Sequence, residues 1–272
     1  MRVFEVSAFT RDNKGGNKAG VALLYNTVSE TIMQDIAAQL GYSETAYIIK
    51  TGEDMFDVRF FTPTEEVDLC GHATIASFSM LKTSGLIDGN NPKQHTKAGD
   101  LNINIDGDNI LMEMAEEKVG EKVDKTTVGQ LLCVDKDKII LEPQLVSVGL
   151  FDCMVLVDSL ETLNNLNMQR SAMIDFSNEK NITGFHVCAI ENGKYYVRNY
   201  GPACGIDEES ATGTANGAMY VYLRENGLID SLQTIEFLQG DIMDSPSTIV
   251  VSTIDNKIWV GGKATINKEK HI

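Results

Sequence analysis

The chain contains an internal repeat that covers two glycine-led apolar segments. Residues 71–87 align without a gap on residues 213–229, and seven of the 17 aligned pairs are identical, where composition alone would give roughly one. Just upstream, residues 58–63 and 197–202 share valine, arginine, an aromatic residue and proline in the same order. The repeat predicts two domains of one kind. A duplicated fold is expected to place its ligand site between the copies, where two equivalent helix starts can face one cavity.

Each copy is followed by a pair of segments in which apolar and polar residues alternate, separated by turn residues. This is the pattern of a β-hairpin, and it occurs at 101–114 after the first copy and at 248–260 after the second. The stretch 116–122 is charged and lacks a periodicity that would bury one face. It therefore predicts a boundary between an N-terminal domain at 1–118 and a C-terminal domain at 119–272, whose last segment could return to the first domain.

The first half reads mainly as strands, with one helix before the repeat. Apolar residues at helical spacing predict a helix at 31–40. Thr31 with Gln34 forms a capping box in this interpretation, and Gly41 ends the helix. A strand follows at 42–49, with Glu44 near its start. In the second half we expect strands at 146–157, 185–190 and 194–200 and a polar helical region at 160–173.

Size and charge narrow the class of protein. The 272 residues suffice for two ordinary cores, and 43% of them are hydrophobic. No apolar run approaches the roughly 20 residues of a membrane span, and the first six residues resemble a strand more than a signal peptide, so we expect a cytoplasmic protein without a membrane partner. A formal net charge of −16 argues against a nucleic-acid partner.

The cysteines and histidines do not indicate a metal site. Five cysteines and four histidines are scattered without paired ligand spacing, so we expect free thiols and no structural metal.

Each repeated helix is predicted to begin directly at a glycine, Gly71 in one copy and Gly213 in the other. A glycine lets the backbone approach a ligand, and the first turn of a helix offers unpaired N–H groups and a partial positive charge. Either start could hold a carboxylate or a developing oxyanion. The alternative is that both glycines only form tight turns.

Two motifs resemble the signatures of the phenazine-biosynthesis PhzF-like family. The first is residues 68–74, with residues 62–67 before it, and the second is residues 208–215. The second has glutamate at Glu209 where the family usually has aspartate, and Ser210 where it has proline. The resemblance continues at residues 16–21, 43–45, 239–240 and 246–247.

The resemblance implies an α+β, diaminopimelate-epimerase-like fold. Such a fold has two similar domains, each a curved sheet around a central helix, with the active site in the cleft between them. It also implies a homodimer.

The resemblance further implies site residues. Glu44 would be the general acid/base, His72 would bind substrate and relay protons, and Glu209 would be their partner. From the residues alone, a surface glutamate at a strand start is the preferred interpretation of Glu44, and the family resemblance reverses it. In apolar surroundings its pKa would be raised toward a useful range. The expected substrate-binding residues are Asn17, Gly71, Ala73, Gly213 and Thr214.

Cys70 separates two kinds of chemistry. Racemases of this fold need a thiol at both equivalent helix starts, but the equivalent of Cys70 is Thr212, whose hydroxyl has no accessible anion at neutral pH. Cys70 is then expected to be a small buried packing residue. We therefore expect a cofactor-independent isomerase that shifts a proton within a small carboxylate-bearing metabolite. The alternatives are an amino- or hydroxy-acid epimerase and a non-catalytic binding protein.

Overall fold

The computed structural model describes residues 1–272, which divide into two compact units. Unit 1 comprises Met1–Glu113 and Gly261–Ile272, and unit 2 comprises Met114–Val260. The structure thus divides the chain five residues before the expected boundary, and the last 12 residues belong to unit 1. The charged stretch that suggested a boundary is an exposed strand of unit 2, β9 (Lys118–Lys122), which pairs with β10. Its charges reflect exposure, which a linker and an outer strand share.

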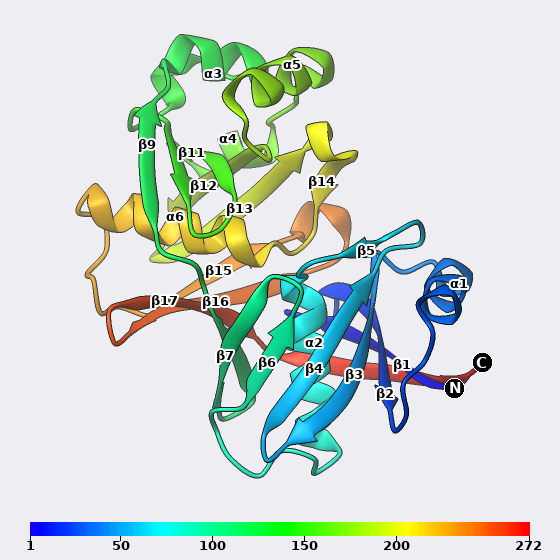
Figure 1. The fold of residues 1–272 in the computed structure, drawn as a ribbon. Coiled ribbons are helices and arrows are strands. Elements are labelled where there is room, and N and C mark those ends of the chain that lie inside the picture. Colours follow the sequence, from blue (N-terminus) through cyan, green and yellow to red (C-terminus); the bar gives the residue numbers. More distant parts are fainter. The chain divides into compact units, whose positions relative to one another are not determined.

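Unit 1 is a sheet with two helices (Figure 1). Its elements are β1 (Arg2–Ala8), β2 (Asn17–Leu24), α1 (Glu30–Leu40), β3 (Glu44–Gly52), β4 (Met55–Phe61), β5 (Glu66–Val67), α2 (Gly71–Thr83), β6 (Lys93–Thr96), β7 (Gly99–Asp106), β8 (Asn109–Glu113) and β18 (Ala264–His271).

Unit 2 is a sheet with four α-helices and three short 3₁₀ turns. Besides β9, its elements are α3 (Lys125–Leu131), η1 (Lys136–Lys138), β10 (Gln144–Ser147), β11 (Phe151–Val157), α4 (Leu160–Asn164), α5 (Arg170–Lys180), β12 (Phe185–Glu191), β13 (Lys194–Gly201), η2 (Pro202–Cys204), β14 (Ile206–Glu209), α6 (Gly213–Glu225), β15 (Ile235–Gln239), η3 (Asp241–Met243), β16 (Ser247–Ile254) and β17 (Lys257–Gly262), whose last two residues count with unit 1.

Both units pair their strands in the same order and with the same directions. Unit 1 has the order β18-β1-β2-β3-β4-β6-β7, and unit 2 has β9-β10-β11-β12-β13-β15-β16. In each order the third and fourth strands are parallel, as are the fifth and sixth, and the other neighbours are antiparallel. Short strands β5 and β14 add to β4 and β13. The units therefore share one topology, as the sequence repeat predicts.

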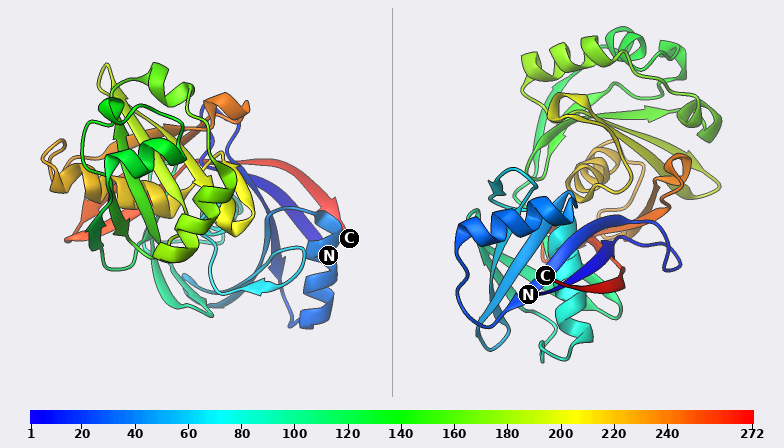
Figure 2. Two further views of the ribbon diagram at one scale, coloured as in Figure 1. Left: turned by 90° about the horizontal axis from the view of Figure 1, so that it is seen from above. Right: turned by 90° about the vertical axis from the view of Figure 1, so that its right-hand side faces the viewer.

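The repeated segments form the central helix of each unit, α2 and α6, which begin at the predicted glycines. In unit 1, α2 contacts β1, β2, β3, β8 and β18 (Figure 2), and nine of its 13 residues are buried. Two of its buried polar side chains bond within the helix: Thr74 Oγ1 donates to the Cys70 carbonyl at 2.8 Å, and Ser77 Oγ donates to that of Ala73 at 2.6 Å. A helix can be surrounded by a curved sheet when its surface is apolar on all sides or when its polar side chains form hydrogen bonds within the helix.

Helix α1 covers the opposite face of the unit 1 sheet (Figure 2). It buries Met33, Ile36 and Ala37 in a cluster that includes Leu24 of β2 and Tyr47 of β3. The outer face therefore has a small core of its own, separate from the packing around α2.

The ends of α1 differ in part from the sequence-based expectation. Gly41 does end the helix, with a left-handed φ of 66°. The capping box is wrong, because the N-cap is Ser29, whose hydroxyl accepts a bond of 3.4 Å from the third helical residue. Gln34 instead donates its side-chain N–H to the Thr62 carbonyl at 2.9 Å. Two hydroxyl residues two positions apart compete for the cap, and the sequence pattern did not distinguish them.

Helices α3, α4 and α5 cover the corresponding face of unit 2 (Figure 1). Val128, Leu163 and Met173 from these helices bury against Cys153 of β11 and Phe185 of β12. The single helical region expected at 160–173 is two helices, because α4 ends at residue 164 and α5 begins at residue 170. No helix of the chain is both long and apolar enough to cross a membrane.

Candidate functional site

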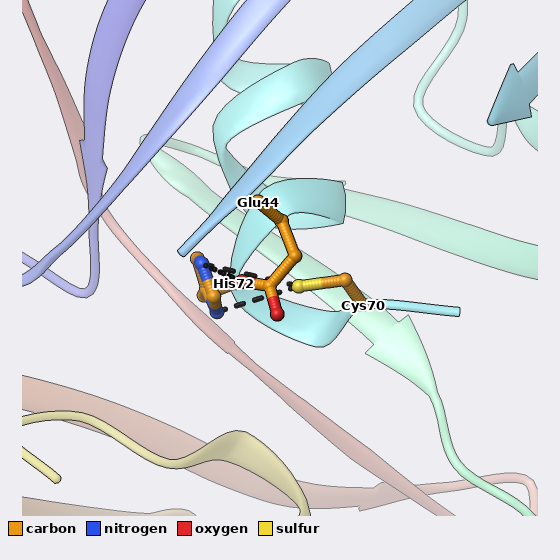
Figure 3. Close-up of side chains that lie close together, drawn as sticks. All are labelled: Glu44, Cys70 and His72. Atoms are coloured by element: carbon orange, nitrogen blue, oxygen red, sulfur yellow. Dashed lines mark hydrogen bonds and ion pairs between the residues drawn. The ribbon is translucent and has the colours of Figure 1, made fainter. Parts of the chain in front are cut away.

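The starts of β3 and α2 bring the side chains of Glu44, Cys70 and His72 together in unit 1 (Figure 3). Glu44 is the first residue of β3 and pairs with Ala19 of the parallel strand β2. Cys70 is the N-cap of α2, and His72 is the second residue of that helix. The Glu44 side chain is 20% exposed and that of His72 is 9% exposed. Glu44 is therefore neither a surface side chain nor sealed in the core.

His72 is the centre of this cluster. Its Nε2 lies 3.1 Å from Oε2 of Glu44, and its Nδ1 lies 3.4 Å from Sγ of Cys70. The amide nitrogen of Asn17, an expected substrate-binding residue, is 3.5 Å from the same Nδ1. Cys70 was expected to serve only packing, but its contact with His72 makes it part of the cluster.

The Glu44–His72 ion pair sets the charge state of both residues. Burial acts to raise the pKa of Glu44, but the interaction with His72 outweighs it and lowers the pKa below its ordinary value. Burial likewise acts to lower the pKa of His72, and its interactions with Cys70 and Glu44 raise it well above the ordinary value. The sequence-based expectation of a raised Glu44 pKa is therefore wrong in its net direction. At neutral pH the pair is a carboxylate beside an imidazolium. Burial raises the pKa of the Cys70 thiol.

We expect this ion pair to give the free energy of unfolding a bell-shaped pH dependence. The lowered pKa of Glu44 adds stability above its ordinary value of 4.5, and this is lost as the pH falls through the folded-state pKa. The raised pKa of His72 adds stability below its ordinary value of 6.5, and this is lost as the pH rises through the folded-state pKa. The free energy of unfolding in urea is compared for the native chain and His72→Gln across this pH range. The difference should be largest at pH values from 4.5 to 6.5.

The control for this experiment is His271→Gln, which changes an exposed histidine. A difference between the native chain and His72→Gln that does not vary with pH would contradict the ion pair.

Both central helices begin without a side-chain cap. Neither Cys70 nor Thr212, the two N-caps, accepts a hydrogen bond from the first turn through its side chain. A Cβ added to Gly71 would meet only Met112 Cε, at 3.6 Å, so packing inside unit 1 does not require a glycine there. The first turn of α2 therefore has uncapped N–H groups next to Glu44. These groups could bind a substrate carboxylate or an oxyanion, as the sequence predicted.

The three side chains also present a set of atoms that could ligate a metal ion. One ligand atom from each of Glu44, Cys70 and His72 lies within 4.8 Å of the others. Sequence spacing missed this set because Glu44 comes from a distant strand. Metal binding would require the imidazolium and the buried thiol to lose their protons, and the ion pair already satisfies the charges. We assign no metal to the site.

In unit 2 the predicted residue Glu209 lies at the end of β14, just before α6. Thr212 Oγ1 donates to Glu209 Oε2 at 2.8 Å. Gln239 fixes this turn, because its Nε2 donates to the Glu209 carbonyl at 2.7 Å and its Oε1 accepts from the Thr212 backbone at 3.2 Å. Glu209, Gly213 and Thr214 are thus gathered at the start of α6. That they serve the same ligand as Glu44 stays a prediction.

A buried histidine that sequence reasoning did not single out supports the same helix start. Asn199 Nδ2 donates to His186 Nδ1 at 3.1 Å, and His186 Nε2 donates to Asn216 Oδ1 at 3.2 Å. Asn216 Nδ2 in turn donates to the Thr212 carbonyl at 2.7 Å. Burial lowers the pKa of His186 to about 4, so it is neutral and serves as a structural hydrogen-bonding residue.

Comparison with known proteins decides the family. A family model described as phenazine biosynthesis-like protein, PhzC-PhzF, matches residues 6–270. The chain belongs to the PhzC-PhzF family. An uncharacterised isomerase of Clostridium acetobutylicum is 32% identical to it, over 97% of this chain and 95% of the relative. The uncharacterised isomerase YddE of Salmonella typhimurium is 31% identical, over 97% of this chain and 96% of the relative.

Solved structures show the same fold. A PhzF-family phenazine biosynthesis protein of Bacillus anthracis superposes with a TM-score of 0.87 at 24% identity, covering 100% of this chain and 98% of that one. A hydroxyproline epimerase of Agrobacterium vitis, with bound trans-4-hydroxy-L-proline, gives a TM-score of 0.64 at 13% identity, over 99% of this chain and 91% of that one. The fold of this family member is therefore the α+β, diaminopimelate-epimerase-like fold. The names of the relatives support an isomerase or epimerase.

Proposed function

We propose that this chain is a cofactor-independent isomerase that moves a proton between two carbons of a small carboxylate-bearing metabolite, with Glu44 as the general acid/base. The observation that carries the proposal is the Glu44–His72 ion pair, 3.1 Å across, at the uncapped start of α2. This arrangement supplies a base, a nearby cation and an anion-binding helix end in one place.

The charge state suggests the order of events. Glu44 begins as a carboxylate and takes a proton from a carbon that the substrate carboxylate makes acidic. The His72 imidazolium and the N–H groups that open α2 stabilise the negative charge that spreads over the conjugated substrate. Glu44, now protonated, returns the same proton to a second carbon on the same face. The enzyme ends in its starting state, and no electrons are gained or lost.

The second family motif, residues 208–215, lies in unit 2, and on that ground we propose that unit 2 takes part in the same reaction. We propose that Glu209, Gly213 and Thr214 contribute to the substrate site, together with Asn17, Gly71 and Ala73 of unit 1. The start of α6 is equivalent to that of α2 and likewise lacks a side-chain cap, which supports a second anion-binding end. A homodimer in the cytoplasm is likewise a proposal from the family resemblance.

An epimerase is the second candidate, and one contact favours it. Cys70 Sγ lies 3.4 Å from His72 Nδ1, and the same fold occurs in a hydroxyproline epimerase. A two-base thiol mechanism still lacks its second thiol, because the other N-cap is Thr212. An epimerase on this chain would therefore use a single thiol or a carboxylate.

Exchange of substrate hydrogen with heavy water distinguishes these functions. The purified protein is first examined by native mass spectrometry for a bound metabolite, and that compound is then incubated with the protein in heavy water alongside a panel of unsaturated, amino and hydroxy acids. Deuterium at a new carbon of a rearranged product supports the isomerase. Exchange with inversion at one centre would replace it with an epimerase, and binding without exchange would leave a binding protein.

We expect Cys70→Ser to keep most of the turnover and to lose some stability. Serine is smaller than cysteine and less apolar, so it packs less well at a site that is 8% exposed. The proposed proton transfer does not pass through the thiol. Deuterium uptake and urea unfolding are measured on the same preparation. Loss of exchange with native stability would show that Cys70 is the base.

A further inference from the structure

The outer face of the unit 1 sheet has a cavity of about 270 Å³ beside the start of α1. Its rim is formed mainly by polar side chains of β4 and of the end of β6. Its floor is apolar and consists of Leu24, Val28, Met33, Tyr47 and Ile49. None of the residues that line the cavity belongs to the Glu44 cluster. An apolar cavity with a few polar groups at one side is the usual form of a small-molecule site.

The helices that cover the outer faces explain where this cavity comes from. The third and fourth strands of each sheet are joined by residues 25–43 in unit 1 and by residues 158–184 in unit 2. Helices α1 and α5 are counterparts, because each has 11 residues and ends at a left-handed residue, Gly41 or Asn181, shortly before the fourth strand. Helix α4 comes before α5, whereas unit 1 has only a loop before α1. Unit 1 therefore lacks a counterpart of α4.

Strand pairing shows which sheet positions correspond. Arg59 and Arg198 are equivalent in the repeat. Arg59 pairs with Tyr47, and Arg198 pairs with Val187. Carrying this register to the neighbouring parallel strands gives the counterparts of three floor residues: Leu24, Tyr47 and Ile49 correspond to Val157, Val187 and Ala189.

In unit 2 these three positions are covered by leucines. Val157, Val187 and Ala189 belong to one buried cluster with Leu163 of α4 and Leu166 just after it. Helix α4 contacts β11, β12 and β13 (Figure 1). The cavity of unit 1 therefore corresponds to the space that α4 fills in unit 2.

The two equivalent arginines form the same ion pair with an acid of the neighbouring short strand. Arg59 donates from Nε and Nη2 to Glu66 of β5, at 2.7 and 2.6 Å. Arg198 donates from the same two nitrogens to Glu208 of β14, both at 2.8 Å. This shared geometry leaves the third nitrogen, Nη1, turned to the outer face in both units.

Nη1 has partners in unit 2 and none in unit 1. Arg198 Nη1 donates to the carbonyls of Leu163 at 3.0 Å, Asn164 at 3.4 Å and Leu166 at 3.2 Å. Arg59 Nη1 has no hydrogen-bond partner in the protein. The Arg59 side chain is 36% exposed and that of Arg198 is 11% exposed. The cavity thus lacks both the leucine side chains and the carbonyl oxygens that unit 2 has in the same place.

The rim of the cavity has no unbalanced positive charge. Each cation there has a carboxylate partner: Arg59 has Glu30 and Glu66, Lys97 has Glu66, and His95 has Asp100. Asp57 adds a further acid to the rim. A charged carboxylate would therefore find no unpaired cation. An uncharged oxygen can accept a hydrogen bond from Arg59 Nη1 without breaking an ion pair.

We propose that this cavity binds a small uncharged molecule that carries a branched hydrocarbon group and a carbonyl oxygen. The hydrocarbon group lies on the apolar floor, as Leu163 does on the equivalent strands of unit 2. The carbonyl oxygen accepts from Arg59 Nη1, as the Leu163 carbonyl accepts from Arg198. The site is separate from the Glu44 cluster, so this inference does not depend on the proposed function.

The first test uses N-acetyl-leucinamide, which has a leucine side chain and two uncharged carbonyl groups. The full chain is labelled with ¹³C at the methionine methyl groups and titrated by NMR, and the Met33 signal is identified by its loss in Met33→Leu. We expect a saturable shift of this signal with a dissociation constant of about 1 mM, which is ordinary for a molecule of this size.

Two related compounds test the proposed chemistry. N-acetylglycinamide lacks the hydrocarbon group and N-acetyl-leucine carries a charged carboxylate, so each should bind about tenfold more weakly or less well still. Absence of a saturable shift with N-acetyl-leucinamide, or equal binding of all three compounds, overturns the proposal. A Met33 signal that changes on dilution but does not respond to N-acetyl-leucinamide would assign the cavity to a second copy of the chain, which also overturns it.

Variants then locate the binding site. Val28→Trp should fill the cavity and abolish the shift, whereas Ile32→Trp, at a residue of α1 that is 50% exposed and does not line the cavity, should bind as the native chain does. Arg59→Lys keeps the charge but loses the Nη1 donor, and it should weaken binding about tenfold. If Arg59→Lys does not fold, the two tryptophan variants decide. Native binding by Val28→Trp overturns the site.

Discussion

Glu44→Gln is expected to abolish substrate-dependent deuterium uptake. Glutamine keeps the shape of glutamate and can still hydrogen-bond, but it cannot accept and return a proton. Losing a positioned general acid/base typically lowers the rate by about 10²–10⁴-fold. The variant should still fold, because Glu44 is partly exposed at the start of β3. Mass spectrometry of the product formed in heavy water measures the effect.

The matched control is Glu66→Gln. Glu66 is also a unit 1 glutamate in an ion pair, with Arg59 at 2.6 Å, but it lies outside the Glu44 cluster. Exchange by Glu66→Gln should stay near the native rate wherever the variant is folded. Native exchange by Glu44→Gln would remove Glu44 from the mechanism.

Gly184→Ala is expected to destabilise the protein strongly. The added Cβ would lie 1.8 Å from the Tyr200 carbonyl oxygen and 3.0 Å from the Gly201 Cα. These are backbone atoms of the neighbouring strand, so only a shift of the sheet can relieve the clash. Overpacking of a core usually costs about 1–3 kcal/mol, and we expect the upper end of that range or more because no side chain can move aside. The free energy of unfolding in urea provides the measurement.

Gly52→Ala is the control for this substitution, because its added Cβ would make ordinary contacts of 3.5 Å with Met55. It should change the unfolding free energy by less than about 1 kcal/mol. Equal effects of the two variants would mean that β12 and β13 are more loosely joined than their pairing indicates.

Features encoded in short motifs were predictable from the sequence. The repeat predicted the shared topology, and both central helices begin at the expected glycines. Glu44 and His72 were identified through the family motifs, and the structure brings them within 3.1 Å of each other. These predictions succeeded because a repeat and a helix-start motif are each contained in one stretch of chain.

Features that depend on neighbours in space were not predictable. The direction of the Glu44 pKa shift is set by His72, which lies on another element. Cys70 could not be linked to His72 by residue type alone. A motif identifies a reacting group, whereas the charge state of that group depends on its neighbours in the folded protein.

The return of the last strand to unit 1 affects the order in which the chain can fold during synthesis. β18 pairs with β1 along its length, and the Ile272 N–H donates to the Met1 carbonyl at 2.8 Å. Unit 2 is one continuous stretch, so all of its strands are made before β18. The strand β1 precedes unit 2 in the chain, so its edge stays exposed until β18 has been made. A chain that stops short of β18 would keep an open strand edge, which is a template for aggregation.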